Sequence, residues 1–410
     1  MRKPLEGIRV VELSTFVAAP VCGRLLRDLG AEVVKIEAAG GDMWRETVRM
    51  YVPDVYNEDH NPIYDLYNTG KHHISLNLKT KEGMEALHKL LEKADVFLTN
   101  TRYAALERLG ITYEQLKDTY PSLIYAFVVG YGEKGPDKDL PAFDTTAFWA
   151  RSGFLRDLAN DDGEHYQPVT PPGGVGDTFT GYLLLSQINA ALYRRTFDGQ
   201  GELVKSGLYH NAIFGMGSMN IKYQEESVPN LPSRRSLGYS FMGSYGCADG
   251  EWIYFSRGTV KDFENKIARM VGLDCLTEDP EFQDPVLRKI NREKHYVMFK
   301  EAFLKQTSAY WLEKLKELDV AGLRMSHFKD VHKDEQAWAN DYLEHMQFRD
   351  GTTGVMPTCP IEMESVGKVP SKPAPKVGHD TVAVLQDLGY SEAEINDMIA
   401  TGAVAVKRKV

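Results

Sequence analysis

The chain opens with a strand, a helix and a second strand, and this pattern limits the fold more than any other feature. Apolar residues favour strands over residues 8–13 and 32–36. Residues 21–29 between them carry a helical pattern that ends at Gly30. A helix that joins two strands in this way places them parallel in one sheet. The sequence therefore predicts an α/β fold with a parallel sheet.

The same alternation continues downstream. We expect a helix over residues 81–93 and strands over residues 96–98 and 123–129. Residues 130–176 are rich in Gly, Pro and Asp and include several aromatic side chains, which is typical of a long loop at a functional site. Another strand-to-helix unit begins at residue 203. These elements predict a large Rossmann-like domain of parallel strands and helices.

The middle of the chain has a different pattern. Residues 243–248 and 252–255 flank Asp249-Gly250, which indicates a hairpin, and several helices follow. The predicted domains are residues 1–220 for the first part of the large domain, 221–328 for a smaller α+β domain, and 329–410 for a return to the large domain. In this last part, a helix is expected over residues 335–345.

Composition excludes several classes of partner. The 58 acidic and 48 basic side chains give a net charge of −10, without a basic stripe for nucleic acid. The longest apolar stretches, near residues 182–192, are interrupted by Ser186 and Gln187 and are too short to span a bilayer. Residues 1–7 lack the apolar core of a signal peptide. We therefore expect a cytoplasmic protein that binds neither nucleic acid nor membrane.

Missing motifs narrow the chemistry further. The four cysteines lie far apart, and the histidines form neither a His-Glu-x-x-His motif nor a tight cluster with cysteine, so we expect reduced thiols and no metal. The turn at residues 14–20 has no glycine triplet, which disfavours a nicotinamide cofactor. No phosphate-binding loop of the Walker type and no Gly-x-Ser-x-Gly motif occurs. The sequence predicts no tightly bound cofactor.

Residues 173–181 are the most distinctive segment, because glycines surround a single carboxylate, Asp177. Asp177 could be the N-cap of the apolar helix that follows, with its carboxylate accepting the first free amides. It could instead be a nucleophile that the helix dipole keeps ionised. The pattern alone favours the cap and leaves both roles open.

Residues 176–181 resemble the nucleophile motif of the family III CoA-transferases. Similarity to this family extends over nearly the whole chain, in residues 5–13, 29–37, 40–42, 79–83, 94–96, 100–110 and 388–391. Residues 130–136, 143–151 and 334–342 resemble one branch, the 2-hydroxyacid CoA-transferases of amino-acid-fermenting anaerobes.

The resemblance implies a reaction. Asp177 would attack an acyl-CoA to form a mixed anhydride and then an aspartyl-CoA thioester, from which a free carboxylic acid takes the CoA. CoA thioesters would thus be substrates. Within the branch, the donor would be a 2-enoyl-CoA such as isocaprenoyl-CoA and the acceptor a 2-hydroxy acid such as 2-hydroxyisocaproate. Transfer from cinnamoyl-CoA to phenyllactate is the alternative, and the sequence leaves the choice open.

The resemblance also implies site residues. Positions that match the family's CoA contacts are Val17, Ala18, Leu76, Asn100, Thr101, Arg102, Ala105 and Arg108. Arg108 is the expected partner of a CoA phosphate. Ala38 stands where relatives often have a second phosphate-binding arginine, and Arg102 or Arg45 could replace it.

The resemblance also suggests roles for Asp144 and for a lid over the substrate. Asp144 matches an assisting glutamate of formyl-CoA transferase, although it could simply start a turn after Pro141. The family's mobile glycine-rich lid is poorer in glycine here, and the predicted lid or substrate-pocket residues are Gly238, Tyr239, Phe241, Met242 and Gly243. The aromatic residues among them could equally belong to a core.

Other functions remain as alternatives. The 2-methylacyl-CoA racemases of this fold carry a Gly-His-Asp triplet, which here reads Ala142-Phe143-Asp144 and lacks the imidazole base. A non-catalytic CoA-binding protein would need only residues 100–108, and the intact Gly176-Asp177 pair argues against it. The resemblance further implies an interlocked homodimer.

Overall fold

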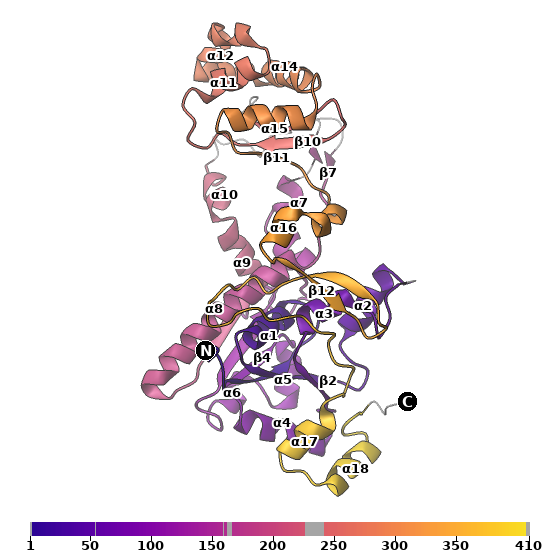
Figure 1. Cartoon of the computed structure of the whole chain (residues 1–410). Helices are drawn as coiled ribbons and strands as arrows, with labels where there is room; N and C mark the ends of the chain where they lie inside the picture. Colours follow the sequence, from indigo (N-terminus) through magenta and orange to yellow (C-terminus); the bar gives the residue numbers. More distant parts are fainter. Residues whose placement is uncertain (1, 54, 159, 162–165, 226–241, 407–410) are drawn as a thin grey trace. The chain divides into compact units, whose positions relative to one another are not determined.

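The computed structural model describes residues 2–53, 55–158, 160–161, 166–225 and 242–406 (Figure 1). Contacts divide the chain into two compact units. The first contains Met1–Gly153, Pro171–Gly217 and Asp334–Val410, and the second contains Phe154–Thr170 and Ser218–Lys333. Residues 154–170 thus join the second unit, although the sequence analysis placed them in the large domain.

The first unit is built on a six-stranded parallel sheet. Its strands are β1 (Arg9–Leu13), β2 (Glu32–Glu37), β3 (His72–Ser75), β4 (Val96–Thr99), β5 (Ile124–Val129) and β8 (Leu203–Gly207). They lie in the order β3-β2-β1-β4-β5-β8, and every neighbouring pair is parallel. This is the order of a Rossmann sheet, which confirms the α/β prediction.

Helices form an apolar core on each face of this sheet. Helices α1 (Ala18–Asp28) and α8 (Val175–Asp198) contribute to one core cluster. The other cluster contains residues of α4 (Lys81–Glu92), α5 (Tyr103–Leu109), α17 (Thr381–Asp387) and α18 (Glu392–Ala400). Leu385, Leu388, Ile395 and Met398 bring the end of the chain back to the core of the first unit.

The remaining elements of this unit are mostly short. They are α2 (Met43–Tyr51), α3 (Pro62–Asn68), α6 (Tyr113–Leu116), the π-helix η1 (Asp144–Ala150), α9 (Leu208–Gly215), α16 (Glu335–Ala339), β12 (Leu343–Gln347) and β13 (Thr353–Pro357). The single helix predicted over residues 335–345 is wrong. Asp341 adopts a left-handed φ of 57°, and the chain then pairs with β13 as an antiparallel strand.

The second unit is a smaller α+β structure, as predicted. Its three-stranded antiparallel sheet contains β9 (Gly243–Gly246), β10 (Trp252–Phe255) and β11 (Gly322–Arg324), so the predicted hairpin at Asp249-Gly250 is confirmed. The other elements are α7 (Phe154–Asp157), β6 (Asn160–Asp161), β7 (Tyr166–Gln167), α11 (Phe263–Met270), η3 (Asp274–Thr277), α12 (Pro280–Gln283), α13 (Pro285–Ile290), α14 (Arg292–Phe303), α15 (Ser308–Glu317) and η4 (Phe328–Lys333), with α10 (Gly217–Lys222) at the boundary. Aromatic side chains such as Phe255, Phe263 and Phe299 fill its core.

All four cysteines are free thiols. Among the helices of the described residues, none combines the length and the apolar character that crossing a membrane requires.

Candidate active site

The site lies where the direction of the sheet's strand order changes. From β1 the chain adds β2 and β3 on one side, and from β4 it adds β5 and β8 on the other. Open α/β sheets bind ligands at this switch point, beyond the carboxyl ends of the strands. Here those ends lead into residues 14–17 after β1 and 100–102 after β4, which include several predicted CoA contacts.

Asn100 joins the two segments. Its side-chain oxygen accepts a hydrogen bond from the Thr15 N–H at 3.0 Å, and its amide donates to the Thr15 carbonyl at 2.7 Å. The Thr99 hydroxyl adds a bond to the Leu13 carbonyl at 2.7 Å. Because both polar groups of the Asn100 side chain bind the backbone, this predicted CoA contact also fixes the loop after β1.

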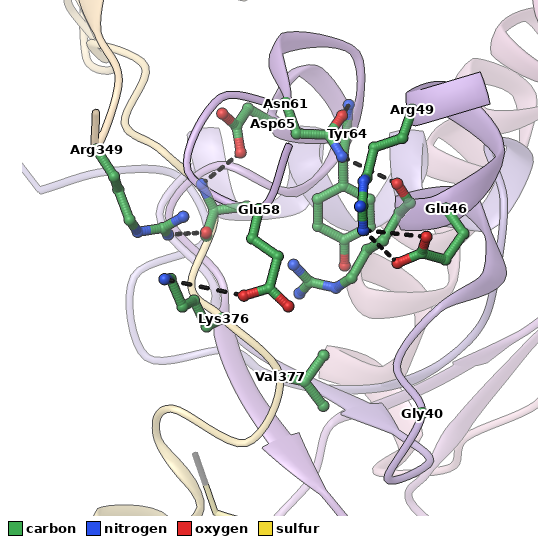
Figure 2. Close-up of a pocket in the computed structure, with 12 residues that line it drawn as sticks. Gly40, Glu46, Arg49, Glu58, Asn61, Tyr64, Asp65, Arg349, Lys376 and Val377 are labelled. Atoms are coloured by element: carbon green, nitrogen blue, oxygen red, sulfur yellow. Dashed lines mark hydrogen bonds and ion pairs between the residues drawn. The ribbon is translucent and has the colours of Figure 1, made fainter. Parts of the chain in front are cut away.

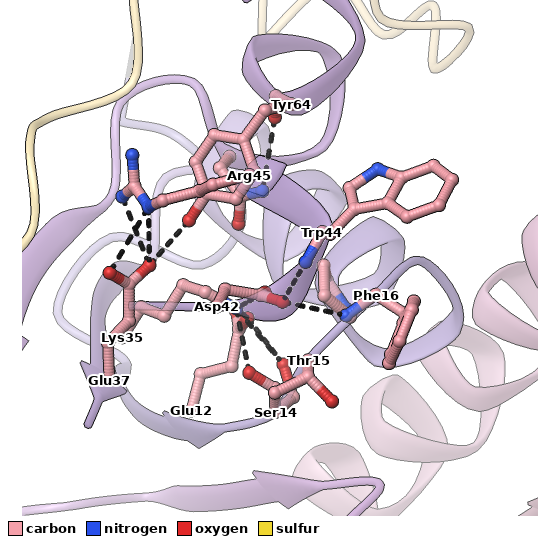
Figure 3. A network of polar contacts seen from close by, with 12 residues as sticks. Glu12, Ser14, Thr15, Phe16, Lys35, Glu37, Asp42, Trp44, Arg45 and Tyr64 are labelled. Atoms are coloured by element: carbon pink, nitrogen blue, oxygen red, sulfur yellow. Dashed lines mark hydrogen bonds and ion pairs between the residues drawn. The ribbon is translucent and has the colours of Figure 1, made fainter. Parts of the chain in front are cut away.

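A buried network of polar contacts also holds the loop after β1 (Figure 3). Lys35 Nζ lies 3.0 Å from Glu12 Oε1 and 3.1 Å from Asp42 Oδ2, and it donates to the Ser14 carbonyl at 2.9 Å. Asp42 Oδ1 accepts the Phe16 N–H at 3.2 Å. Phe16 has a φ of 63°, which is rare for a residue with a side chain. The network therefore stabilises a strained turn at the edge of the site.

The start of α8 approaches η1 closely because residue 176 is a glycine. A Cβ atom at Gly176 would lie 2.2 Å from Phe148 Cγ and 2.4 Å from Asp144 Oδ1. Gly174, with a φ of 87°, is the N-cap residue of the helix. The glycines around Asp177 thus serve packing and backbone geometry, which brings two carboxylates together.

Asp144 supplies the helix cap that the sequence analysis considered for Asp177. Its buried carboxylate accepts hydrogen bonds from the N–H groups of Gly174 at 2.9 Å and Asp177 at 3.2 Å. Helix α8 begins at Val175 with Gly174 as its N-cap residue, so Asp177 lies within the first turn. The prediction that Asp177 is the N-cap is therefore wrong, because the free amides already have an acceptor from another segment.

Asp177 is half-buried, and its electrostatic environment opposes ionisation. Burial and, next, the negative charge of Asp144 raise the pKa of Asp177 to about 7. The expectation from the sequence is that the helix end keeps this carboxylate ionised, whereas burial and the charge of Asp144 act in the opposite direction. A second carboxylate occupies the amide donors that would have stabilised its charge.

Tyr67, on α3, is a site residue that the sequence analysis missed. A Cβ on Gly174 would lie 3.5 Å from Tyr67 Oη and 3.8 Å from Val17 Cγ1, so both side chains border the start of α8. Burial, followed by the charge of Asp177, raises the pKa of Tyr67 to about 12. No motif marked this residue, and α3 itself was not predicted.

Three predicted CoA contacts have little exposed surface. Val17, Ala18 and Leu76 are 3%, 4% and 2% exposed, and Leu76 belongs to the core beside α4. In this conformation, a ligand would reach them chiefly through the backbone. Val17 and Ala18 lie at the switch point next to α8, whereas Leu76 follows β3 at the edge of the sheet.

The predicted phosphate-binding arginines differ in whether their guanidinium groups are free to bind a phosphate. Arg102 and Arg108, at the ends of α5, are exposed, and neither side chain forms an ion pair with another described residue. Ala105 lies between them on α5, and Thr101 precedes the helix. Arg45 instead binds Glu37 at 3.0 Å and the Pro375 carbonyl at 2.9 Å. Arg45 is therefore a poor replacement for the missing arginine at Ala38.

A pocket beside Arg45 is lined by ion pairs (Figure 2). Arg49 binds Glu46 at 2.8 Å, Lys376 binds Asp59 at 2.7 Å, and Arg349 donates to the Ala374 carbonyl. Each of these cations already has an acceptor within the protein. These contacts connect the segment around residues 374–377 to its neighbours. The three cations of the pocket are therefore not free to bind an anionic ligand.

The predicted lid is only partly described. Gly238, Tyr239 and Phe241 lie outside the described residues. Met242 packs against the core of the second unit, and Gly243 begins β9. Their role as a lid stays a prediction.

Three aromatic side chains meet next to Asp144. Phe143 contacts Phe16 edge to face, with ring centroids 5.6 Å apart, and Phe16 contacts Trp44 at 5.9 Å. Phe143 remains 49% exposed. We call Phe16, Trp44 and Phe143 the aromatic wall. Phe143 is one of the aromatic residues of the loop over residues 130–176 that the sequence associates with a functional site, and it also replaces the racemase histidine.

The chain is similar to known CoA-transferases over almost its full length. It is 40% identical over 394 residues to (R)-2-hydroxy-4-methylpentanoate CoA-transferase of Clostridioides difficile, covering 96% of this chain and 97% of that protein. It is 34% identical over 410 residues to cinnamoyl-CoA:phenyllactate CoA-transferase of Clostridium sporogenes, covering 98% of each chain.

Solved structures show the same fold. A crystal structure of Rv3272 from Mycobacterium tuberculosis matches with a TM-score of 0.77 and 25% identity, covering 93% of this chain and 99% of that one. A CaiB/BaiF family protein from Brucella suis matches with a TM-score of 0.78 and 24% identity, covering 95% and 100%. Residues 5–381 match CoA-transferase family III, and the chain is therefore a CoA-transferase of this family.

Proposed function

We propose that this enzyme transfers CoA from an acyl-CoA to a 2-hydroxy carboxylic acid with an apolar side chain, with Asp177 as the nucleophile. The observation that carries the proposal is the half-buried carboxylate of Asp177 next to Asp144, in the glycine-flanked first turn of α8. The names of the relatives that are 40% and 34% identical support the acid class.

The proposed reaction takes place at two carbonyl carbons, that of the acyl-CoA thioester and that of the Asp177 side chain. An Asp177 oxygen attacks the thioester carbon, a C–O bond forms, the C–S bond breaks, and CoA leaves as a thiolate. The thiolate then attacks the Asp177 carbonyl of the anhydride and releases the donor acid as a carboxylate, leaving an aspartyl-CoA thioester. The acceptor carboxylate then attacks the aspartyl-CoA thioester, which forms a new anhydride and releases the CoA thiolate. The thiolate attacks the acceptor's carbonyl carbon, so that the acceptor leaves as its CoA thioester and Asp177 regains its carboxylate.

The environment of Asp177 suits this exchange. Burial removes part of the hydration shell that makes an ordinary carboxylate a weak nucleophile. A limited exposure also reduces access of water, which would hydrolyse the anhydride. Asp144 is proposed to act as a positioning residue, because its carboxylate binds the backbone on both sides of residue 176.

The aromatic wall supports an acid with an apolar side chain. Phe143 directly precedes Asp144 and is 49% exposed, and an exposed aromatic ring favours alkyl or aryl groups over charged ones. We propose 2-hydroxy-4-methylpentanoate, which is 2-hydroxyisocaproate, as the acceptor and a 2-enoyl-CoA such as isocaprenoyl-CoA as the donor. Phenyllactate with cinnamoyl-CoA is the second candidate, supported by the relative that is 34% identical.

CoA is proposed to lie along the switch point, near Val17, Ala18, Asn100 and Thr101. Its phosphates would bind the exposed guanidinium groups of Arg108 and Arg102. We further propose an interlocked homodimer and a cytoplasmic location, where CoA thioesters are available.

Racemisation of a 2-methylacyl-CoA is less well supported. Two-base exchange at the α-carbon needs an imidazole at position 143, whereas Phe143 cannot accept a proton. The aromatic wall instead uses this side chain for packing.

A panel of acceptors tests the proposal directly. Purified enzyme and one 2-enoyl-CoA donor are combined with 2-hydroxy-4-methylpentanoate, phenyllactate, lactate and the hydroxyl-free control 4-methylpentanoate. We expect the highest kcat/KM with 2-hydroxy-4-methylpentanoate. Equal rates with 4-methylpentanoate would refute recognition of the 2-hydroxyl group. Exchange of the α-proton with deuterated water, without CoA transfer, would favour the racemase.

A further inference from the structure

We propose that the second unit binds a divalent metal ion, with Zn²⁺ as the first candidate, through Asp279, Glu281 and His295. One potential ligand atom from each residue lies within 4.8 Å of the others. Asp279 is the N-cap residue of α12, Glu281 is in its first turn, and His295 belongs to α14. The sequence predicts no metal, because it contains no tight cluster of histidine and cysteine along the chain.

His295 provides the independent sign of a ligand. Its side chain is 0% exposed, yet neither ring nitrogen has a hydrogen-bond partner in the described structure. A neutral imidazole has one N–H donor and one acceptor nitrogen, and buried polar groups of this kind normally have partners. A metal ion would accept the lone pair of one nitrogen and explain why the ring is buried beside two carboxylates.

The distances are close to those of a metal site. Zn²⁺ binds histidine nitrogen at about 2.0–2.1 Å and carboxylate oxygen at about 2.0–2.2 Å. Two ligands of one ion therefore lie at most about 4.4 Å apart, so the group has to contract slightly. Asp279 and Glu281 are half-buried, which leaves their side chains room to turn.

The local backbone is consistent with this role. Asp279 Oδ1 accepts the N–H of Glu281 at 2.9 Å, which orients the carboxylate at the start of α12 and leaves its second oxygen for the ion. One imidazole and two carboxylates leave a fourth position for water in a tetrahedral site. The ion would connect α12 to α14 and stabilise the second unit.

Lys294 competes with the metal. Its Nζ lies 2.7 Å from Glu281 Oε2, so binding of a cation has to displace an ammonium group. This contact predicts a moderate affinity that rises when the competing charge is removed. Lys289 is an exposed lysine of the neighbouring helix α13 and serves as the matched control.

Calorimetric titration of the full chain with ZnCl₂, after treatment with a chelator, tests the site. We expect one ion per chain and a higher Tm in its presence. Glu281→Gln should weaken binding at least tenfold, whereas Glu278→Gln, which changes an exposed neighbouring carboxylate, should not. Lys294→Gln should strengthen binding several-fold, and Lys289→Gln should leave it unchanged.

Two results would overturn the proposal. One is the absence of stoichiometric binding to the wild-type chain. The other is binding that Glu281→Gln and Lys294→Gln leave unchanged, which would place the zinc elsewhere, for example at the exposed thiol of Cys275. Glu281→Gln preserves the N–H that Asp279 binds, so this variant remains interpretable where replacement of buried His295 would disturb folding.

Discussion

The carboxylate of Asp144 accepts a hydrogen bond from the backbone N–H of Asp177 at 3.2 Å, while its charge contributes to the raised pKa of the Asp177 carboxyl. One side chain thus fixes the start of α8 and makes the neighbouring carboxylate harder to ionise. This relationship connects the fold of the first unit to the proposed chemistry of Asp177.

Replacing the proposed nucleophile should abolish transfer. We expect Asp177→Asn to reduce kcat by at least about 1,000-fold, because no other group would form the anhydride. Asp118→Asn, which changes an exposed carboxylate of the same unit, is the control. A variant at Asp177 that keeps more than a tenth of the wild-type rate would rule out covalent catalysis by this residue.

The same substitution should stabilise the protein at high pH. The pKa of Asp177 rises from 3.8 to about 7 on folding, so the folded chain holds a proton that the unfolded chain releases. Wild-type stability contributed by this group is complete below pH 3.8 and is lost as the pH rises through about 7.

Asp177→Asn removes this dependence. Its free energy of unfolding relative to wild type should increase by about 1–2 kcal/mol between pH 5 and pH 8, since partial exposure weakens the effect. Urea denaturation at both pH values measures the difference. A constant difference would mean that the pKa of Asp177 is not raised.

Catalysis should require the ionised form of Asp177. We expect kcat/KM to rise with pH along a limb centred near the pKa of about 7 in the free enzyme. In Asp144→Asn the limb should move to lower pH, because the neighbouring negative charge is gone. A limb that stays at the same pH in this variant would show that Asp144 does not influence the ionisation of Asp177.

Removing the helix cap that Asp144 provides should lower the free energy of unfolding. Asp144→Ala removes the acceptor of the Gly174 and Asp177 N–H groups, and we expect about 1–2 kcal/mol of destabilisation. Asp144→Asn retains an acceptor oxygen, so this variant should be destabilised less than Asp144→Ala. Equal unfolding midpoints for wild type and Asp144→Ala in urea would contradict the capping role.

The aromatic wall should determine acceptor preference. Phe143→Ala is expected to lower kcat/KM for 2-hydroxy-4-methylpentanoate by about tenfold, the usual effect of lost apolar contacts in a pocket. Lactate, with only a methyl group, should be affected much less. The comparison uses one acyl-CoA donor throughout. An equal loss for both acids would mean that Phe143 supports the fold and does not contact the substrate side chain.

Much of the first unit could be predicted from local pattern. The strand–helix–strand start and Gly30 predicted a parallel sheet, because each element has its own periodicity and end signal. Helix α3, which carries Tyr67, lacked such a signal. The strand at Leu343–Gln347 depends on pairing with β13 in a hairpin, and this pairing overrides the helical pattern around residue 340.

Only part of the candidate site could be predicted from the sequence, because no motif marks Tyr67. Asp177 and Asp144 could be selected by resemblance, whereas the pattern around residue 177 predicted a cap at the wrong residue. The true cap comes from a residue 33 positions away along the chain, so local sequence could not identify it. The raised pKa of Asp177 follows first from burial and then from the charge of the same distant residue, and neither can be read from the local sequence.

Trapping the covalent intermediate tests the central proposal most directly. Enzyme incubated with a 2-enoyl-CoA is treated with hydroxylamine, digested and examined by mass spectrometry, with Asp177→Asn treated in parallel. We predict a hydroxamate on the Asp177 side chain that depends on the acyl-CoA and is absent from the variant. An active wild-type enzyme without modification at Asp177, or with modification at another carboxylate, would contradict the proposal.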